Sequence, residues 1–142
     1  MSSRNRGQEG AAAVEFALVS VLLLTLVFSI IQYGFYFYES QSAAAGSREA
    51  VRLAVVGIPD CNLYTAGVKA KVTGLSSGYQ YQLSYPNGRT VGEKVSVVIV
   101  FTPTKLGFPF VPFISGKSSQ TGFARLERNE TSWPDCSGTV TP

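Results

Sequence analysis

The strongest pattern in the chain is an apolar run near the N-terminus that extends from Phe16 to Phe37 without a charged residue. Its polar or small interruptions are Ser20, Thr25, Ser29, Gln32 and Gly34. As a helix, these roughly 22 residues would measure about 33 Å, enough to cross a hydrocarbon core of about 30 Å. Aromatic residues crowd the C-terminal end of the run, as in an interfacial belt: Tyr33, Phe35, Tyr36, Phe37 and Tyr38. Because the rest of the chain is too small to bury such a helix, the pattern predicts a membrane span over about residues 16–38.

A helical pattern continues beyond this span from Glu39 to about Val56. Small residues recur on one face of the segment: Ala43, Ser47, Ala50 and Ala54. Such a smooth stripe lets a sheet of the same domain, or another helix, approach closely. The helix is expected to end at the breakers that follow it, Gly57, Pro59 and Asp60. We therefore expect one long helix over residues 11–57, about half of it in lipid and half under a small domain.

Strand patterns appear in the C-terminal half of the chain. Apolar and polar side chains alternate, or β-branched residues cluster, in three segments that predict strands, the second of them central: residues 79–85, 93–102 and 118–127. Residues 62–73 are ambiguous, with a short helix favoured. The predicted fold class is therefore α+β, with a long N-terminal transmembrane helix followed by a small antiparallel β-sheet domain over residues 58–142.

Charge sets the expected orientation and argues against one class of partner. The chain has 12 Lys and Arg against 9 Asp and Glu, a net charge of +3. Its basic residues are too scattered to form the clustered face that binds nucleic acid, so no nucleic-acid partner is expected. Arg4 and Arg6 precede the span, and positive charge tends to remain cytoplasmic. We expect a single-pass protein of the cytoplasmic membrane with a cytoplasmic N-terminus and with residues 58–142 extracytoplasmic.

The two cysteines, Cys61 and Cys136, both lie in the part that is expected outside the cytoplasm, where a disulfide can persist. Closing a loop of about 75 residues would stabilise the domain by roughly 4 kcal/mol through loop-closure entropy. A reduced pair is the alternative, and the expected compartment favours the bond.

The most informative stretch is GAAAVEF, from Gly10 to Phe16, at the head of the span. A short polar leader, residues 1–10, ends at Gly10, and four apolar residues then precede Glu15. A carboxylate at the edge of a membrane span carries a desolvation cost that is rarely tolerated without use. The alternative is an interfacial Glu15 whose side chain reaches the lipid headgroups. The position between a basic leader and a span favours a functional carboxylate.

The stretch RGQEGAAAVEFALV and the small-residue, arginine-bearing helix from Ser42 to Ala54 resemble the TadE-like family, the minor pilins or pseudopilins of tight-adherence (Tad/Flp, type IVc) pili. The likeness covers about residues 6–56. It implies a pilin-like helix, cleavage by a prepilin peptidase between Gly10 and Ala11, and pairing of the new α-amino group with Glu15 of a neighbouring subunit. It also implies partners: other pilin or pseudopilin subunits, the pilus assembly platform, the prepilin peptidase and the lipid bilayer. Phe16 stands where the pilin motif often has tyrosine, which leaves the efficiency of processing open.

Two other functions remain open. The chain could be a membrane-anchored extracytoplasmic binding domain outside any filament, or a secreted domain released by signal peptidase after Ala45. The apolar run is longer than the 7–15 residues or so that are typical of a signal peptide, which weighs against release. Catalysis has little support, because the sequence contains no histidine, no phosphate-binding glycine loop and no nucleophile elbow. We expect no enzyme activity and no cofactor or metal.

Two further features invite functional interpretations. The tyrosines of the first predicted strand, Tyr79, Tyr81 and Tyr85, could stack on a sugar or on single-stranded nucleic acid, but core packing is favoured because one strand face must be buried. The segment from Leu106 to Ile114 is unusually apolar for a connector. It is expected either to cover the sheet or to dock on a neighbouring subunit.

Overall fold

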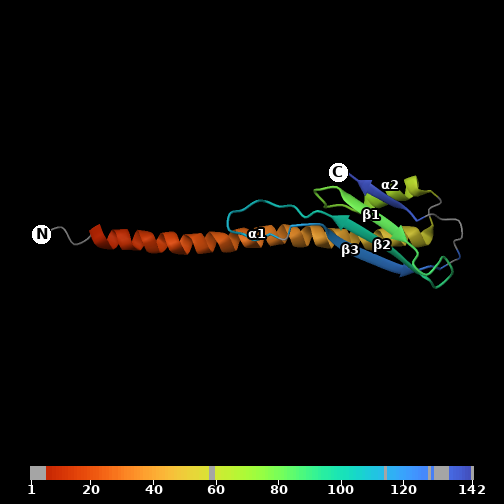
Figure 1. Cartoon of the computed structure of the whole chain (residues 1–142), viewed down its shortest axis with the longest axis horizontal. Helices are drawn as coiled ribbons and strands as arrows, with labels where there is room; N and C mark the ends of the chain where they lie inside the picture. Colours follow the sequence, from red (N-terminus) through yellow and green to blue (C-terminus); the bar gives the residue numbers. More distant parts are fainter. Residues whose placement is uncertain (1–5, 58–59, 114, 128, 130–134, 142) are drawn as a thin grey trace. The chain divides into compact units, whose positions relative to one another are not determined.

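The computed structural model describes the chain except residues 1–5, 58–59, 114, 128, 130–134 and 142, and the side chains of residues 6–9 also stay undescribed. The elements follow in the order α1 (Arg6–Val56), α2 (Cys61–Lys71), β1 (Tyr79–Ser84), β2 (Lys94–Phe101), β3 (Ser118–Arg125) and β4 (Ser137–Val140) (Figure 1). One long helix followed by a small antiparallel sheet confirms the predicted α+β class. Much of the predicted leader, including Arg4, and the predicted helix breaker Pro59 lie outside the described residues.

The chain groups into two compact units. The first contains Met1–Gly34 and Lys105–Ile114, and the second contains Phe35–Thr104 and Ser115–Pro142. The first unit therefore holds the apolar part of α1 together with most of the connector between β2 and β3. The second unit holds the rest of α1, α2 and the whole sheet.

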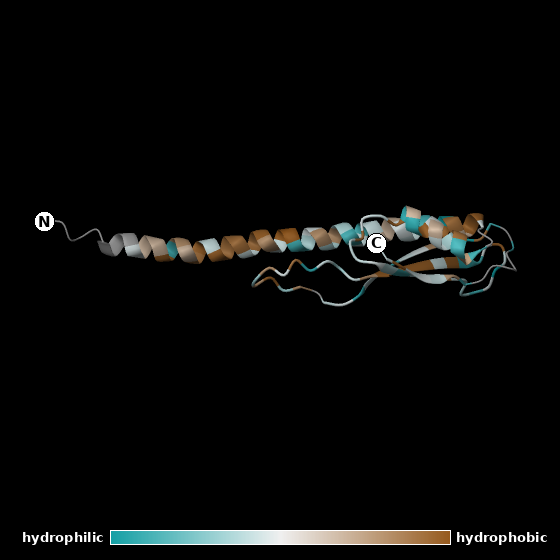
Figure 2. Cartoon of the chain, turned by 90° about the horizontal axis from the view of Figure 1, so that it is seen from above, coloured by the Kyte–Doolittle hydropathy of each residue, from teal (hydrophilic) through white to brown (hydrophobic). Residues whose placement is uncertain are grey.

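In the first unit, hydrophobic residues, drawn in brown, predominate along α1 and are interrupted by a few white and teal ones (Figure 2). Many of its large side chains are exposed, among them Val14, Phe16, Leu18, Leu22, Leu26 and Ile30. The hydroxyl groups bond to carbonyls of the helix itself: Ser20 to Ala17 at 2.9 Å, Thr25 to Val21 at 2.8 Å and Ser29 to Thr25 at 2.7 Å. By its length and composition, this helix is able to cross a membrane.

In the second unit, the sheet has the strand order β3-β2-β1-β4, and every neighbouring pair is antiparallel. The predicted central strand, β2, is central. Alternate residues of β1 and β2 form the buried face: Tyr79, Tyr81, Leu83, Val95, Val97, Ile99 and Phe101. Tyr79 and Tyr81 are only 5% and 2% exposed, which confirms that the tyrosines of β1 pack in the core.

The small-residue stripe of α1 is also buried in this core. Its members Ala43, Ser47, Ala50 and Ala54 are at most 2% exposed, so the stripe serves packing within the domain. The approach to β3 is close, because a Cβ on Gly122 would lie 2.5 Å from the Ser47 carbonyl oxygen. A side chain at position 122 would therefore collide with helix backbone, and glycine is required there.

Two elements of the domain, α2 and β4, were ambiguous or absent in the prediction from sequence. The ambiguous segment forms α2, and Tyr64 of α2 donates a hydrogen bond of 2.9 Å to the Ala50 carbonyl of α1. The short strand β4 was not predicted. It pairs with β1, and the ring of Tyr81 lies over its Gly138, where a Cβ would meet the ring at 2.9 Å.

Candidate processing and assembly site

The residues predicted for processing and assembly, Gly10, Ala11 and Glu15, all lie in the first turns of α1. All three are exposed, and a Cβ built on Gly10 would have no atom within 4 Å. Their helical spacing decides which of them share a face. Gly10 and Glu15 are five residues apart and point in different directions, whereas Ala11 and Glu15 are four apart and lie on one face.

This spacing has a chemical consequence at the peptide bond between Gly10 and Ala11. If that bond is hydrolysed, the new α-ammonium group belongs to Ala11, about one helical turn or ~6 Å along the axis from the Cα of Glu15. Side chains on a helix lean toward its N-terminus, so the Glu15 carboxylate leans toward the new charge. After hydrolysis, the α-ammonium group of Ala11 and the carboxylate of Glu15 would thus lie on one face near the N-terminal end of α1, next to an apolar helix surface.

A second carboxylate of α1, Glu39, forms a buried polar cluster that the sequence did not reveal. Glu39 is 2% exposed. Its Oε1 accepts hydrogen bonds of 2.6 Å from the Ser76 and Thr104 hydroxyl groups, and its Oε2 accepts one of 2.8 Å from the Thr104 backbone N–H. The two hydroxyl groups also contact each other. The cluster of Glu39, Ser76 and Thr104 therefore ties α1 to the segments that precede β1 and follow β2.

The hydrogen bonds decide the charge state of this carboxylate. Burial by itself raises the pKa of Glu39, because it disfavours the charged form, but the bonds donated by Ser76 and Thr104 outweigh burial and hold the pKa below its ordinary value. Glu39 is therefore ionised at neutral pH. It acts as a fixed hydrogen-bond acceptor in the domain.

In the first unit, residues 105–113, which we call the apolar connector, pack against α1. Several contacts attach it: the Leu106 N–H donates to Gln32 Oε1 at 2.9 Å, the Phe108 ring stacks on Phe28 at 4.6 Å, and Tyr33 Oη donates to the Pro112 carbonyl at 2.9 Å. Gln32 is 1% exposed as a result. The sequence alone shows Gln32 only as a polar interruption of the apolar run.

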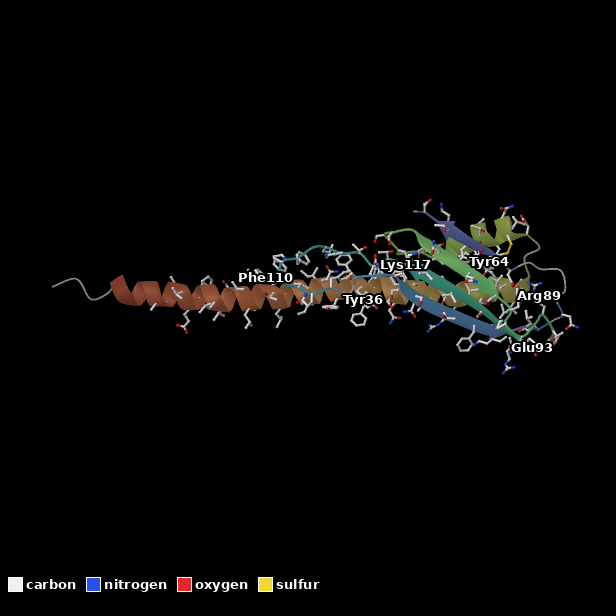
Figure 3. All side chains as sticks on the ribbon, in the orientation of Figure 1. Tyr36, Tyr64, Arg89, Glu93, Phe110 and Lys117 are labelled. Carbon is white, nitrogen blue, oxygen red and sulfur yellow. A yellow bond between two sulfur atoms is a disulfide. The ribbon has the colours of Figure 1, made fainter. Side chains whose placement is uncertain are left out.

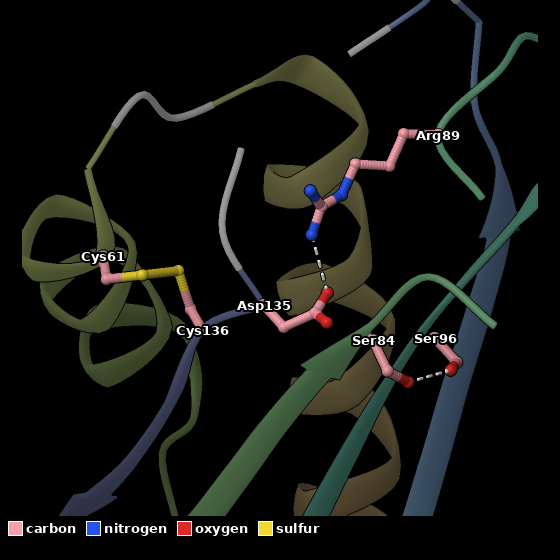
Figure 4. A network of polar contacts seen from close by, with 6 residues as sticks. All are labelled: Cys61, Ser84, Arg89, Ser96, Asp135 and Cys136. Carbon is pink, nitrogen blue, oxygen red and sulfur yellow. Dashed lines mark hydrogen bonds and ion pairs between the residues drawn. A yellow bond between two sulfur atoms is a disulfide. The ribbon is translucent and has the colours of Figure 1, made fainter. Parts of the chain in front are cut away.

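The predicted disulfide is present between Cys61 and Cys136, with an S–S distance of 2.04 Å and Cα atoms 5.5 Å apart (Figure 4). It joins the first residue of α2 to the residue before β4. Beside it, Arg89 and Asp135 form an ion pair at 3.0 Å, and Asp135 is largely exposed. Such an exposed pair contributes little to stability, so the covalent bond is the stronger constraint on β4.

Sequence patterns singled out Gly10, Ala11 and Glu15 and did not reveal the contacts of Glu39 and Gln32. The signal that could have exposed Glu39 and Gln32 is weak: each is a polar side chain that flanks an aromatic cluster on a long apolar helix. What decides their burial is the presence of partners from distant loops, and no local pattern encodes those partners. Among the described residues, no group of three or more metal-binding side chains occurs.

In a comparison with protein families, residues 10–52 fit the family model described as TadE-like protein. The matched segment begins at Gly10, includes Glu15 and ends within the second half of α1, which confirms the resemblance carried by those residues. The sheet lies outside it. The searches of curated proteins and of solved structures found no match.

Proposed function

Taking residues 10–52 as a TadE-like segment, we propose that this chain is a minor pilin, or pseudopilin, that acts in the assembly of a Tad/Flp pilus. The observation that carries the proposal is the exposed Glu15 in the first turns of a helix whose following surface is apolar on all sides. A charge in that position is costly in lipid unless a partner neutralises it.

The proposed location is the cytoplasmic membrane, with α1 as the single span. The exposed apolar side chains of α1 support it, because water would penalise so large an uncovered surface. Arg4 and Arg6 favour a cytoplasmic N-terminus, and residues 58–142 are then extracytoplasmic. The Cys61–Cys136 bond fits an oxidising compartment of that kind.

The proposed processing step is hydrolysis of the peptide bond between Gly10 and Ala11 by a prepilin peptidase. Water adds across the bond, residues 1–10 leave with a new carboxylate on Gly10, and Ala11 gains the α-ammonium group. The open surroundings of Gly10 support access by a protease. The first backbone N–H groups of any helix lack partners within it, so local opening at this end costs little.

In the assembled state, the Glu15 carboxylate pairs with the α-ammonium group of a neighbouring subunit. Ala11 and Glu15 of one chain share a face, so two such helices packed side by side can exchange these charges between them. The exchange neutralises two groups that lipid would otherwise isolate. The proposed partners are pilin or pseudopilin subunits and the assembly platform of the pilus, and the role is structural, with neither catalysis nor a cofactor.

The fold also bears on release by signal peptidase, which would cut after Ala45. Ala45 lies inside α1, next to the buried Gly46 and Ser47. Such a cut would remove the buried Ala43 and the Glu39 carboxylate from the domain that they stabilise. A membrane-retained chain therefore accounts better for this packing than a released one.

Replacement of Glu15 tests the assembly role. In cells that build the pilus, Glu15→Gln keeps the size of the side chain and removes its charge, and Glu49→Gln is a matched control on an exposed part of the same helix. Leaving one partner of a buried ion pair alone costs about 3–5 kcal/mol, so we expect recovery of partner subunits with Glu15→Gln to fall by about a hundredfold or more. Glu49→Gln should match the wild type. Equal recovery with Glu15→Gln at equal membrane levels would refute the role.

A further inference from the structure

The apolar connector presents a hydrophobic tip beside α1. Residues 105–113 include three phenylalanines and two other apolar residues besides proline and glycine, and Phe110 at the tip is 84% exposed (Figure 3). The contacts with Phe28, Gln32 and Tyr33 fix the connector to a short stretch of the helix. The exposed tip therefore continues the exposed apolar surface of α1 within the same compact unit.

The backbone of Phe110 gives a second and independent observation. Phe110 has φ of 63°, and it is the one non-glycine residue with positive φ in the described part of the chain. It follows Pro109 in a turn, at a position where glycine or asparagine is the usual choice. A bulky aromatic residue in the left-handed region costs conformational energy, and an exposed ring recovers none of it in water. A surface outside the chain that covered the ring at the tip would offset this cost.

We propose that the apolar connector inserts into the extracytoplasmic interface of the bilayer that holds α1, with Phe110 among the lipids. This inference rests on the membrane location proposed above. The occupant is lipid, because the tip continues the apolar helix surface that the bilayer already covers. Lys105, exposed at the start of the connector, can meet lipid phosphate groups, as basic residues do at membrane surfaces.

The connector also locates the edge of the hydrocarbon. Its backbone is irregular, and unpaired backbone groups are not tolerated in the lipid core, so the connector lies at the interface. The helix segment beside it, Phe28 to Tyr33, then crosses the boundary between the hydrocarbon and the interface. The hydrocarbon span becomes roughly Ala11 to Ile30, about 20 residues or ~30 Å, in place of the predicted residues 16–38.

This shift changes the setting of Glu15. Counted from Ala11, Glu15 lies about four residues or ~6 Å inside the cytoplasmic boundary, below the level of the headgroups. A carboxylate at that depth has fewer chances to reach water, so the need for a neutralising partner increases. Connector insertion and the role of Glu15 are thus linked through the position of the span.

Fluorescence in lipid vesicles tests the connector directly. The single tryptophan of the chain, Trp133, is first replaced by phenylalanine. One tryptophan is then introduced by Phe110→Trp or, as the reference for the span, by Leu22→Trp. The full chain is reconstituted, at several protein-to-lipid ratios, in vesicles whose phospholipids carry bromine either near the headgroup or deep in the acyl chain. We expect blue-shifted Phe110→Trp emission, quenched most by the shallow bromines, and Leu22→Trp emission quenched most by the deep ones.

The outcomes separate the two proposals. Quenching of Leu22→Trp without quenching of Phe110→Trp would overturn connector insertion and leave the membrane span intact. Absence of quenching at both positions would overturn the membrane location and the insertion with it. If Phe110→Trp is blue-shifted but unquenched at every lipid ratio, and residue 110 cross-links to a second copy, a neighbouring subunit covers the tip and the lipid assignment is wrong.

Discussion

Glu39→Gln tests the buried polar cluster, because it keeps the shape of the side chain and changes one acceptor into a donor. The wild-type carboxylate accepts bonds from the Ser76 and Thr104 hydroxyl groups and from the Thr104 N–H. The amide oxygen of glutamine can still accept from both hydroxyl groups. Its NH2 group then faces the Thr104 N–H. Two donors therefore oppose each other where the wild type has a hydrogen bond from this N–H to a charged carboxylate oxygen.

The magnitude follows from the lost bond. A hydrogen bond to a charged group contributes about 1.5–3 kcal/mol, and a buried donor without a partner adds a penalty of similar size. We expect Glu39→Gln to lower the free energy of unfolding of the domain by about 2–3 kcal/mol. For a domain of this size, 1 kcal/mol corresponds to roughly 4–8 °C in Tm, so Tm should fall by about 10 °C or more.

The pH dependence gives a second signature. Because hydrogen bonding holds the pKa of Glu39 below its ordinary value of 4.5, the stabilisation is fully present above the unfolded-state pKa. It is lost as the pH falls through the lower folded-state pKa. The difference in stability between the wild type and Glu39→Gln should therefore be constant at neutral pH and shrink below about pH 4.5.

The assay is thermal unfolding of the full chain in detergent micelles, followed by near-ultraviolet circular dichroism. This signal reports the buried tyrosines of the domain, whereas the far-ultraviolet signal is dominated by the long helix. Glu49→Gln, an exposed change on the same helix, is the control and should leave Tm unchanged. Equal Tm values for Glu39→Gln and the wild type at neutral pH, or a difference that stays constant down to pH 3, would show that the charge of Glu39 does not stabilise the domain.

Two further substitutions test the packing and the covalent constraint of the domain. Gly122→Ala places a methyl group against the backbone of Ser47 and should cost about 1–3 kcal/mol, whereas Gly34→Ala, with no atom near the new Cβ, should cost nothing. Urea titrations of both variants check this, and an unaffected Gly122→Ala would contradict the close contact. Cys61→Ser should lose about 4 kcal/mol, because the bond closes a loop across a sequence separation of 75. The double variant Cys61→Ser/Cys136→Ser should lose no more free energy of unfolding than either single variant. Additive losses in the same titration would show that the two cysteines do not act through one bond.

The parts of the fold that sequence predicted are those with a strong local signal. The long apolar run predicted the span-length helix, and the alternation around Tyr81 predicted β1 with its buried face. The strand β4 was not predicted, because its four residues contain a single buried apolar side chain, Val140. Its position depends on the disulfide and on pairing with β1.

The polar residues of α1 likewise include some that the sequence singles out and some that it does not. Gly10, Ala11 and Glu15 could be singled out because the roles proposed for them depend on spacing along one helix. The contacts of Glu39 and Gln32 join residues that are 37 or more positions apart in the chain, so they depend on which loops meet α1 in the folded protein. The apolar character of the connector was visible in sequence, but its attachment to Phe28 was not.

The first residue of the mature chain distinguishes a processed pilin from an uncleaved membrane protein and from a secreted domain. Membrane fractions of cells that carry the intact pilus system are solubilised, and the N-terminal peptide of the full-length gene product is identified by mass spectrometry. The account predicts a chain that begins at Ala11, and a Gly10→Leu variant that retains residues 1–10. A wild-type chain that begins at Met1 or Ser2 would contradict processing as a pilin, and one that begins at Gly46 would show release by signal peptidase.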